Sequence, residues 1–196
     1  MKPIYITMLV VIIGYLLGSI NSAVIYSKLR GEDIRNTGSG NAGATNILRT
    51  YGKGAAAIVV VGDIAKGILA VLIGRILGGT HLSYFAGLSA VLGHNYPLYF
   101  GFRGGKGILT SLAVMLMISP KQAVISMVFA IVVIAVTRYV SLGSILGSIL
   151  FGILIAIFST DLWLILVSVA VVLLAVLRHI PNIRRLCNGT ERKLGK

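Results

Sequence analysis

The sequence predicts an all-α integral membrane protein, a bundle of about seven transmembrane helices in a single domain that covers residues 1–196. Hydrophobic residues make up 57% of the chain, and its mean hydropathy is +0.95. Charged residues make up 12%, about half the usual share of a soluble domain. A soluble core of this length could not hide so much apolar surface, so lipid is expected to cover the rest.

The charge is the other global observation. The chain has 18 Lys and Arg residues against 5 Asp and Glu residues, a formal net charge of +13. In a membrane protein this excess indicates cytoplasmic loops, anionic lipid and anionic substrates, so we expect no nucleic acid partner. The single cysteine, Cys187, excludes an intrachain disulfide. No metal or cofactor is expected, because the three histidines have no ligand spacing.

The first predicted span is Ile4–Tyr26, which is long enough to cross a bilayer and reads as a retained helix rather than a signal peptide. Gly14 and Gly18 form a small-xxx-small pair, which predicts a helix-packing face. Asn21 and Ser22 are polar for a position that faces lipid. A hydrophilic stretch, Ser27–Lys53, follows.

The second and third predicted spans are Ala55–Leu77 and Leu82–Phe100. Asp63 and Lys66 interrupt the second, three residues apart on one helical face. An internal ion pair that neutralises two intramembrane charges is as good an explanation of this pair as a catalytic role. His94 and Asn95, in the last turns of the third span, fit an acid/base pair and a hydrogen-bonded packing pair equally well.

The remaining spans are shorter or follow turn signals. Ile108–Ile118 is too short to cross alone, so a tilted or partly buried helix is expected there. Gly143 and Gly147 give the sixth span a second small-xxx-small pair. The fifth to seventh spans are Gln122–Val136, Ser141–Ser159 and 161–177, and a basic tail, Arg178–Lys196, ends the chain.

Seven spans put the termini on opposite sides, and the positive-inside rule orients them with the N-terminus outside and the C-terminus in the cytoplasm. The cytoplasmic face then receives most of the basic residues, and the opposite face only Lys2, Arg75 and Lys121. Every unusual polar stretch falls at the cytoplasmic face, so we expect one site there. These stretches are the loop 36–46, Asp63 with Lys66, His94 with Asn95, the segment 104–107, Arg138 with Ser141, and His179 with Asn182.

The loop Asn36–Asn46 is the strongest functional signal in the chain. It packs glycine, serine, threonine and asparagine residues between two apolar segments, with Arg35 and Arg49 at its sides. Glycines let backbone N–H groups converge on an anion, and a helix that begins just after the loop would add its dipole. The loop is therefore interpreted as a phosphate or carboxylate cradle; a flexible turn is the alternative.

Two nucleotide-binding motifs are excluded by context. Gly38–Gly43 fits G-x-G-x-x-G, but no strand precedes it among membrane helices. Gly101–Gly107 has the wrong spacing for a Walker A loop and lacks its Ser or Thr. Lys106 among these glycines is still interpreted as a point charge aimed at an anion, against the alternative of a helix-end anchor.

The pieces in this order resemble the bacterial glycerol-3-phosphate acyltransferases that use acyl phosphate, the PlsY family. The matching stretches run from the loop to the tail and are specific together, although no single one is. They are 39–46, 62–67, 93–97, 102–107, 138–142 and 178–186, with Gly189 and Glu191.

The resemblance implies a multi-pass enzyme of the bacterial inner membrane, with its active site facing the cytoplasm. It would transfer a fatty acyl group from acyl phosphate to the 1-hydroxyl of sn-glycerol 3-phosphate. The expected partners are these two substrates and membrane lipid, and the expected state is a monomer. The His-x-x-x-x-Asp pair of another acyltransferase class is missing, because Tyr99 occupies its fifth position after His94, and no Gly-x-Ser-x-Gly elbow occurs.

We therefore expect direct attack by the substrate hydroxyl, without an acyl-enzyme. The loop Ser39–Asn46 would hold the leaving phosphate, Lys106 and Arg49 would offset developing charge, and His179 and Asn182 would orient glycerol phosphate. The proton acceptor stays open among His94, His179, Asp63 and a substrate phosphate. The predicted catalytic residues are Lys106, His179 and Ser141, and the predicted substrate-binding residues are Ser39, Gly40, Asn41, Gly43, Thr45, Asn46, Arg49, Asp63, Lys66, His94, Gly104, Gly105, Arg138 and Asn182.

Two other function classes remain open at this point. A transporter of an organic phosphate would also need buried positive charge and helices broken by glycine. It usually has an internal repeat and polar groups near the midplane, whereas here no repeat is found and the polar groups collect at one face. A lipid-binding scaffold would not need so many polar groups set among glycines.

Overall fold

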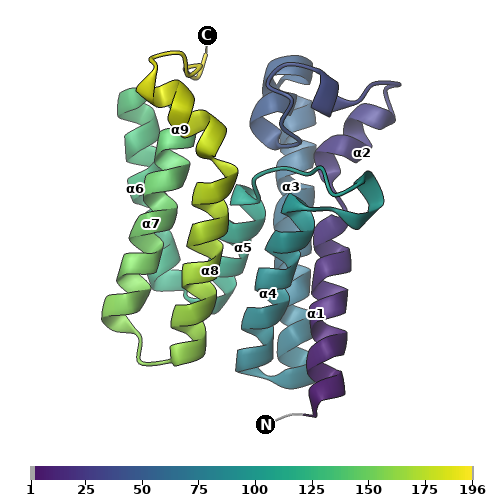
Figure 1. Ribbon diagram of the computed structural model, residues 1–196, viewed down its shortest axis with the longest axis vertical. Helices are drawn as coiled ribbons and strands as arrows, with labels where there is room; N and C mark the ends of the chain where they lie inside the picture. Colours follow the sequence, from purple (N-terminus) through teal and green to yellow (C-terminus); the bar gives the residue numbers. More distant parts are fainter. Residues whose placement is uncertain (1–2, 196) are drawn as a thin grey trace. The chain divides into compact units, whose positions relative to one another are not determined.

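The computed structural model describes residues 3–195, and the secondary structure of these residues is helical throughout, as predicted (Figure 1). The chain divides into two compact units, Met1–Ile118 and Ser119–Lys196. Each unit is described by itself below.

In the first unit, the most extensive helix contacts join α4 to α1 and to α3. Gly14 and Gly18 of α1 face the backbone of Ala86 and Ala90 on α4, and a methyl group on either glycine would overlap these carbonyl oxygens. The predicted small-xxx-small packing face is therefore confirmed. The elements of this unit are α1 (Ile4–Ser19), α2 (Ser22–Lys28), η1 (Ile34–Asn36), α3 (Ala44–Gly78), α4 (Thr80–Asn95), η2 (Leu98–Phe100) and α5 (Ile108–Ile118).

The first predicted span is not one continuous helix. α1 ends at Ser19, Ile20 is extended (φ −70°, ψ 93°), and α2 starts after Asn21. The Asn21 side chain caps α2 by accepting a hydrogen bond from the N–H of Val24. The polarity of Asn21 thus marks a helix start inside the predicted span.

The second predicted span starts 11 residues too late, because α3 begins at Ala44 where Ala55 was expected. It has 35 residues and contains one non-helical position, Gly52, with φ of 84°. A positive φ is available to glycine at little cost, so the helix can kink there and continue. The glycine-rich loop therefore leads directly into a helix.

The third and fourth predicted spans are short in the structure. α4 has 16 residues and ends at Asn95, where the third span was expected to continue to Phe100. α5 has the 11 residues that the sequence predicted. Among the residues that the structure describes, four helical segments have the length and hydropathy of a span, or five with the bent pair α8 and α9. Seven crossings therefore stay a prediction.

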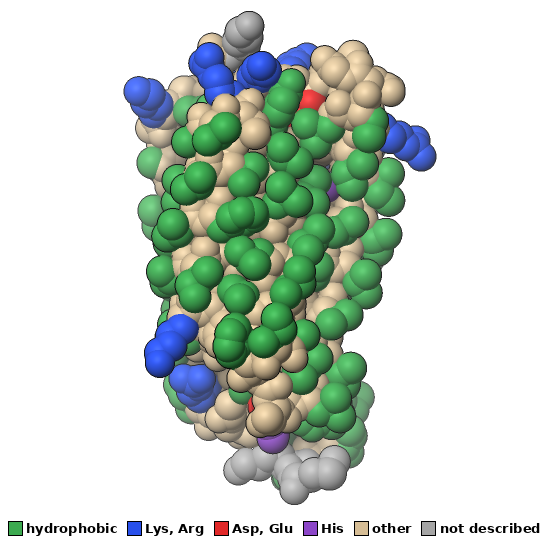
Figure 2. All heavy atoms as spheres, turned by 90° about the vertical axis from the view of Figure 1, so that its left-hand side faces the viewer, with side chains coloured by type: hydrophobic (Ala, Val, Ile, Leu, Met, Phe, Trp, Pro, Cys, Tyr) green, Lys and Arg blue, Asp and Glu red, His purple; other side chains and the backbone are tan. Residues whose placement is uncertain are grey.

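The second unit contains α6 (Pro120–Thr137), α7 (Val140–Phe158), α8 (Leu162–Arg178) and α9 (Ile180–Cys187). Gly143 and Gly147 of α7 pack against Ala130 of α6, so this small-residue pair is also a packing face. α8 and α9 are bent by 54° at His179. Hydrophobic side chains cover most of the face drawn in Figure 2, and Lys and Arg side chains lie toward its two ends.

Candidate active site

The loop before α3 is organised by Asn46, whose side chain is 1% exposed. Its Oδ1 accepts from the N–H of Ser39 at 3.0 Å. Its Nδ2 donates to the carbonyl oxygens of Ile34, Thr37 and Asn41 at 3.0–3.1 Å. The amide of Asn46 is therefore used to shape the loop, a role that the sequence did not predict.

Several backbone amides of the loop donate to acceptors within the loop itself. The N–H groups of Gly40 and Gly43 donate to Thr37 O and Asn41 O, at 3.0 Å each. Fewer backbone N–H groups are therefore available to bind an anion than the sequence predicted. The dipole at the N-terminal end of α3 adds to the remaining ones. Ser39 and Gly40 are exposed, Asn41 and Thr45 are half-buried, and Arg49 is exposed in the second turn of α3.

Arg35 clamps a second glycine-rich segment, 101–107, to this region. Its Nη1 donates to the carbonyl oxygens of Phe100, at 2.7 Å, and Arg103, at 3.3 Å. Its Nη2 pairs with Asp33 Oδ2 at 2.6 Å. The side-chain hydrogen bond from Arg35 lowers the pKa of Asp33 to about 2, so this ion pair persists across the physiological range.

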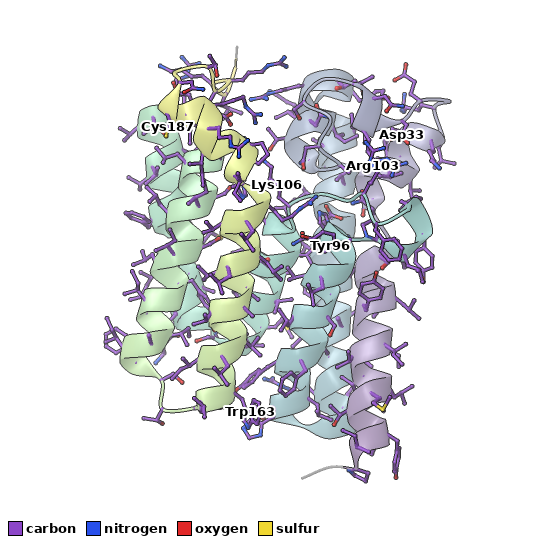
Figure 3. The ribbon with its side chains drawn as sticks, in the orientation of Figure 1. Asp33, Tyr96, Arg103, Lys106, Trp163 and Cys187 are labelled. Atoms are coloured by element: carbon purple, nitrogen blue, oxygen red, sulfur yellow. The ribbon has the colours of Figure 1, made fainter. Side chains whose placement is uncertain are left out.

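The segment 101–107 also packs closely on the end of α4. A methyl group on Gly104 would overlap His94 O, and one on Gly105 would overlap His94 Nε2 and the carbonyl oxygen of Ala42. Only glycine fits at these two positions, because they lie against backbone atoms. Lys106, which Figure 3 labels, is half-buried between buried Gly105 and Gly107. It therefore follows a backbone segment that lies against both His94 and Ala42 of the loop.

Asp63, Lys66 and His94 form one buried cluster. Lys66 Nζ lies 2.9 Å from Asp63 Oδ1 and 2.8 Å from His94 Nδ1. Ser22 Oγ donates to the same Asp63 oxygen at 3.2 Å. The ion pair, one of the two explanations that the sequence left open for Asp63 and Lys66, is therefore present, and His94 contacts it.

In the second unit, the Glu191 carboxylate accepts hydrogen bonds from three side chains. Ser141 Oγ and Asn182 Nδ2 donate to its Oε1, at 2.7 and 2.6 Å, and Arg185 Nε donates to its Oε2 at 2.7 Å. Burial raises the pKa of Glu191, but the three hydrogen bonds outweigh burial and hold this pKa below the ordinary value. Glu191 therefore stays ionised at neutral pH.

Glu191 was not among the predicted site residues. The signal was present in the sequence, because Glu191 is one of only 5 acidic residues and stands in a basic tail. An open cleft of about 490 Å³ lies beside it, lined by Tyr139, Gly189, Arg192 and Lys193. The two cations in this lining suit an anionic group.

His179 and Arg138 lie near the same tail. His179 is 2% exposed, and its Nδ1 lies 2.7 Å from Ala175 O. A carbonyl oxygen can only accept, so Nδ1 carries a proton. Arg138 has a left-handed backbone (φ 63°), and its carbonyl oxygen accepts from the N–H of Leu194 at 2.7 Å.

The predicted site residues thus fall into two groups, one in each unit. In the first unit, the loop, Gly104, Gly105 and the cluster of Asp63, Lys66 and His94 are in contact through His94 and Ala42. In the second unit, Ser141 and Asn182 meet on Glu191.

Two solved structures share this fold. Both are crystal structures of PlsY (YgiH), described as an integral membrane glycerol 3-phosphate acyltransferase. Its glycerol 3-phosphate form matches with a TM-score of 0.92 and 38% identity over 96% of both chains. Its lysophosphatidic acid form matches with a TM-score of 0.89 and 37% identity over 96% of this chain and 95% of the other. The class is therefore that of an all-α integral membrane protein.

The sequence comparisons give the family. The family model for glycerol-3-phosphate acyltransferase matches residues 8–189. A glycerol-3-phosphate acyltransferase of Thermoanaerobacter sp. (strain X514) is 49% identical, with 96% of each chain covered. One of Clostridioides difficile (strain 630) is 42% identical, with 98% of each chain covered. The chain belongs to the glycerol-3-phosphate acyltransferase family and is an enzyme of phospholipid synthesis, which decides against a transporter or a scaffold.

Proposed function

We propose that this acyltransferase takes its fatty acyl group from acyl phosphate and passes it to the 1-hydroxyl of sn-glycerol 3-phosphate, releasing lysophosphatidic acid and inorganic phosphate. The observation that carries the proposal is the position of Lys106, on a glycine backbone packed against the loop 36–46. A lysine ammonium is a compact cation with three donors, suited to a phosphate that gains charge as it leaves.

The leaving phosphate is assigned to the first unit. The exposed or half-buried loop residues and the N-terminal end of α3 bind its oxygens, and Arg49 and Lys106 offset its charge. Asn46 supports this loop from within, since its amide is already bonded to four loop residues. The loop residues in contact with phosphate are Ser39, Gly40, Asn41, Gly43 and Thr45.

Glycerol phosphate is assigned to the second unit, where His179, Asn182 and Arg138 orient it. His179 is one candidate to receive the hydroxyl proton, at Nε2, because its Nδ1 already donates to Ala175 O. A phosphate oxygen of the substrate is the other. Asn182 is held by Glu191, so its carbonyl side is directed away from that carboxylate.

The transfer is proposed to be direct. Ser141 is the one predicted catalytic hydroxyl, and it already donates to Glu191. A carboxylate that accepts from three donors and has a lowered pKa is a weak base, so it does not activate Ser141 as a nucleophile. Ser141 instead helps to fix the position of Glu191. Acyl phosphate is already activated, so orientation and charge stabilisation are enough.

Phosphate release tests the donor. Purified protein in lipid nanodiscs, mixed with glycerol 3-phosphate, should release phosphate from palmitoyl phosphate and should be inactive with palmitoyl-coenzyme A. Acyl transfer from the thioester alone would contradict the proposed donor. Labelled acyl phosphate without glycerol 3-phosphate should leave no acyl group on the protein, and a labelled Ser, Cys or Lys would contradict direct attack.

We further propose a multi-pass monomer in the bacterial inner membrane, with about seven crossings, the active site facing the cytoplasm and the C-terminus inside. The support is the excess of Lys and Arg on one side of the predicted spans. The tail's Arg184, Arg192 and Lys193 are then placed to meet anionic lipid.

A further inference from the structure

Three titratable side chains are buried together in the first unit. Lys66 Nζ lies 2.9 Å from Asp63 Oδ1, 2.9 Å from Ile20 O and 2.8 Å from His94 Nδ1. The side chains of Lys66, Asp63 and His94 are 5%, 1% and 4% exposed. Side chains this enclosed leave little surface for a substrate to contact. Any influence of the cluster on the reaction must therefore pass through the residues packed against it.

The contacts of Lys66 fix which nitrogen of His94 carries the proton. A carboxylate and a backbone carbonyl only accept hydrogen bonds, so two ammonium protons go to Asp63 and Ile20. The third points at His94 Nδ1, which must supply a lone pair. The ammonium form also balances the Asp63 carboxylate, whose buried charge would otherwise be uncompensated.

The distance to Asp63 supports the same assignment. His94 Nδ1 lies 3.6 Å from Asp63 Oδ1, which is beyond hydrogen-bond range. A proton on Nδ1 would therefore face the Lys66 ammonium and lack an acceptor on Asp63. The neutral ring of His94 carries its proton on Nε2.

Nε2 of His94 lies where the two glycine-rich segments meet. A methyl group on Gly105 would overlap both this nitrogen and Ala42 O. The N–H of Gly105 also donates to His94 O at 3.2 Å. His94 therefore holds the segment by its backbone, and its Nε2 lies against Gly105, the residue before Lys106.

We propose that Asp63 and Lys66 are positioning residues that hold His94 as a fixed Nε2–H donor at the junction of the two glycine-rich segments. This donor sets the geometry of the segment that carries Lys106, and His94 does not receive the hydroxyl proton. The kinetic consequence rests on the proposed function, whereas the state of the His94 ring does not.

Nitrogen-15 NMR of histidine-labelled protein in nanodiscs reads that state directly. The His94 signals are identified by their loss in His94→Gln. At neutral pH we expect the proton on Nε2 in the wild type. In Lys66→Met the ring is free to place a proton on Nδ1 toward Asp63, so the Nε2 preference should be lost. Lys121→Met, which removes an exposed lysine, should match the wild type. A wild-type ring protonated on Nδ1 would overturn the proposal.

Steady-state kinetics test the positioning role. Lys66→Met should lower kcat about a hundredfold and change the KM for glycerol 3-phosphate less than about threefold. The reason is that the charge of Lys106 would be displaced from its position and not lost. Asp63→Asn with Lys66→Met removes both buried charges, so this double variant should regain thermal stability and stay slow. A folded double variant with wild-type kcat would overturn the proposal, and Lys121→Met should be unchanged.

Two replacements of His94 separate the roles of its nitrogens. Gln keeps a donor near the Nε2 position, and Asn keeps an acceptor near the Nδ1 position. We expect His94→Gln to retain about tenfold more activity than His94→Asn. The opposite order would mean that His94 serves only to satisfy Lys66. Inactive wild-type protein with acyl phosphate would contradict the proposed donor and leave the NMR result standing.

Discussion

At the scale of single residues, Lys106 carries the largest expected effect on the reaction. The glycine before it packs against Ala42 and His94, which fixes the position of the backbone that carries the Lys106 ammonium. If this charge is removed, no other side chain can easily take its position. If an interaction strengthens as the phosphate departs, its loss should raise the activation barrier and not only weaken substrate binding.

Lys106→Ala should therefore lower kcat/KM about a thousandfold, and Lys106→Arg should recover only part of it because its planar head places the charge elsewhere. The measurement is the initial rate of phosphate release by folded protein. Lys53→Ala, at an exposed lysine of α3, is the matched control. An Arg variant as fast as wild type would identify Lys106 as a membrane anchor.

Ser39 and Asn46 are predicted to fail in different ways. Ser39→Ala removes an exposed hydroxyl, so the rate should fall about ten- to a hundredfold at unchanged melting temperature. Asn46→Ala removes the four hydrogen bonds by which the buried amide holds the loop, so the melting temperature should fall as well. Calorimetry beside the activity assay separates the two outcomes. A melting temperature of Asn46→Ala equal to that of the wild type would indicate that Asn46 contacts the substrate and does not hold the loop.

At the scale of elements, Glu191 joins the tail to the start of α7 and to α9 through Ser141, Asn182 and Arg185. Its folded pKa lies below the ordinary 4.5, so this contribution to stability is complete above about pH 4.5 and is lost as the pH falls through the folded pKa. The tail should thus stay ordered in mild acid.

Hydrogen exchange over residues 185–194 tests this. The protection factors should be constant from about pH 7 to 4.5 and should decrease as the pH falls further. Glu191→Gln places an amide donor against donors, so its tail should be unprotected at every pH. A tail that opens in wild-type protein near pH 6 would contradict the role of Glu191.

The elements also show how far the sequence can predict this molecule. Helical class, the two small-residue packing faces and the glycine-rich segments follow from local pattern and are in the structure. The break at Ile20 does not, because its carbonyl is satisfied by Lys66, 46 positions away. The roles of Asn46 and Glu191 were missed for the same reason, since their partners are set by how the loop and the tail fold back.

At the scale of the whole molecule, membrane topology is the remaining test. The proposed topology of about seven crossings predicts that the tail after Arg178 lies in the cytoplasm. A C-terminal alkaline phosphatase, active only in the periplasm, should be silent, and a C-terminal green fluorescent protein should be bright. A fusion after residue 79, between α3 and α4, is expected to give the opposite pattern. Active phosphatase at the C-terminus would reverse the assigned orientation.

The break between α1 and α2 has a consequence for biogenesis. The first 28 residues leave the ribosome before residue 66 does, so the Ile20 carbonyl has no ammonium partner during early insertion. An unsatisfied carbonyl in hydrocarbon costs several kcal/mol, so the nascent segment must keep water or the translocon beside it. The first span is therefore completed only after a later one arrives, and a chain truncated before Lys66 should be a substrate for quality-control proteases.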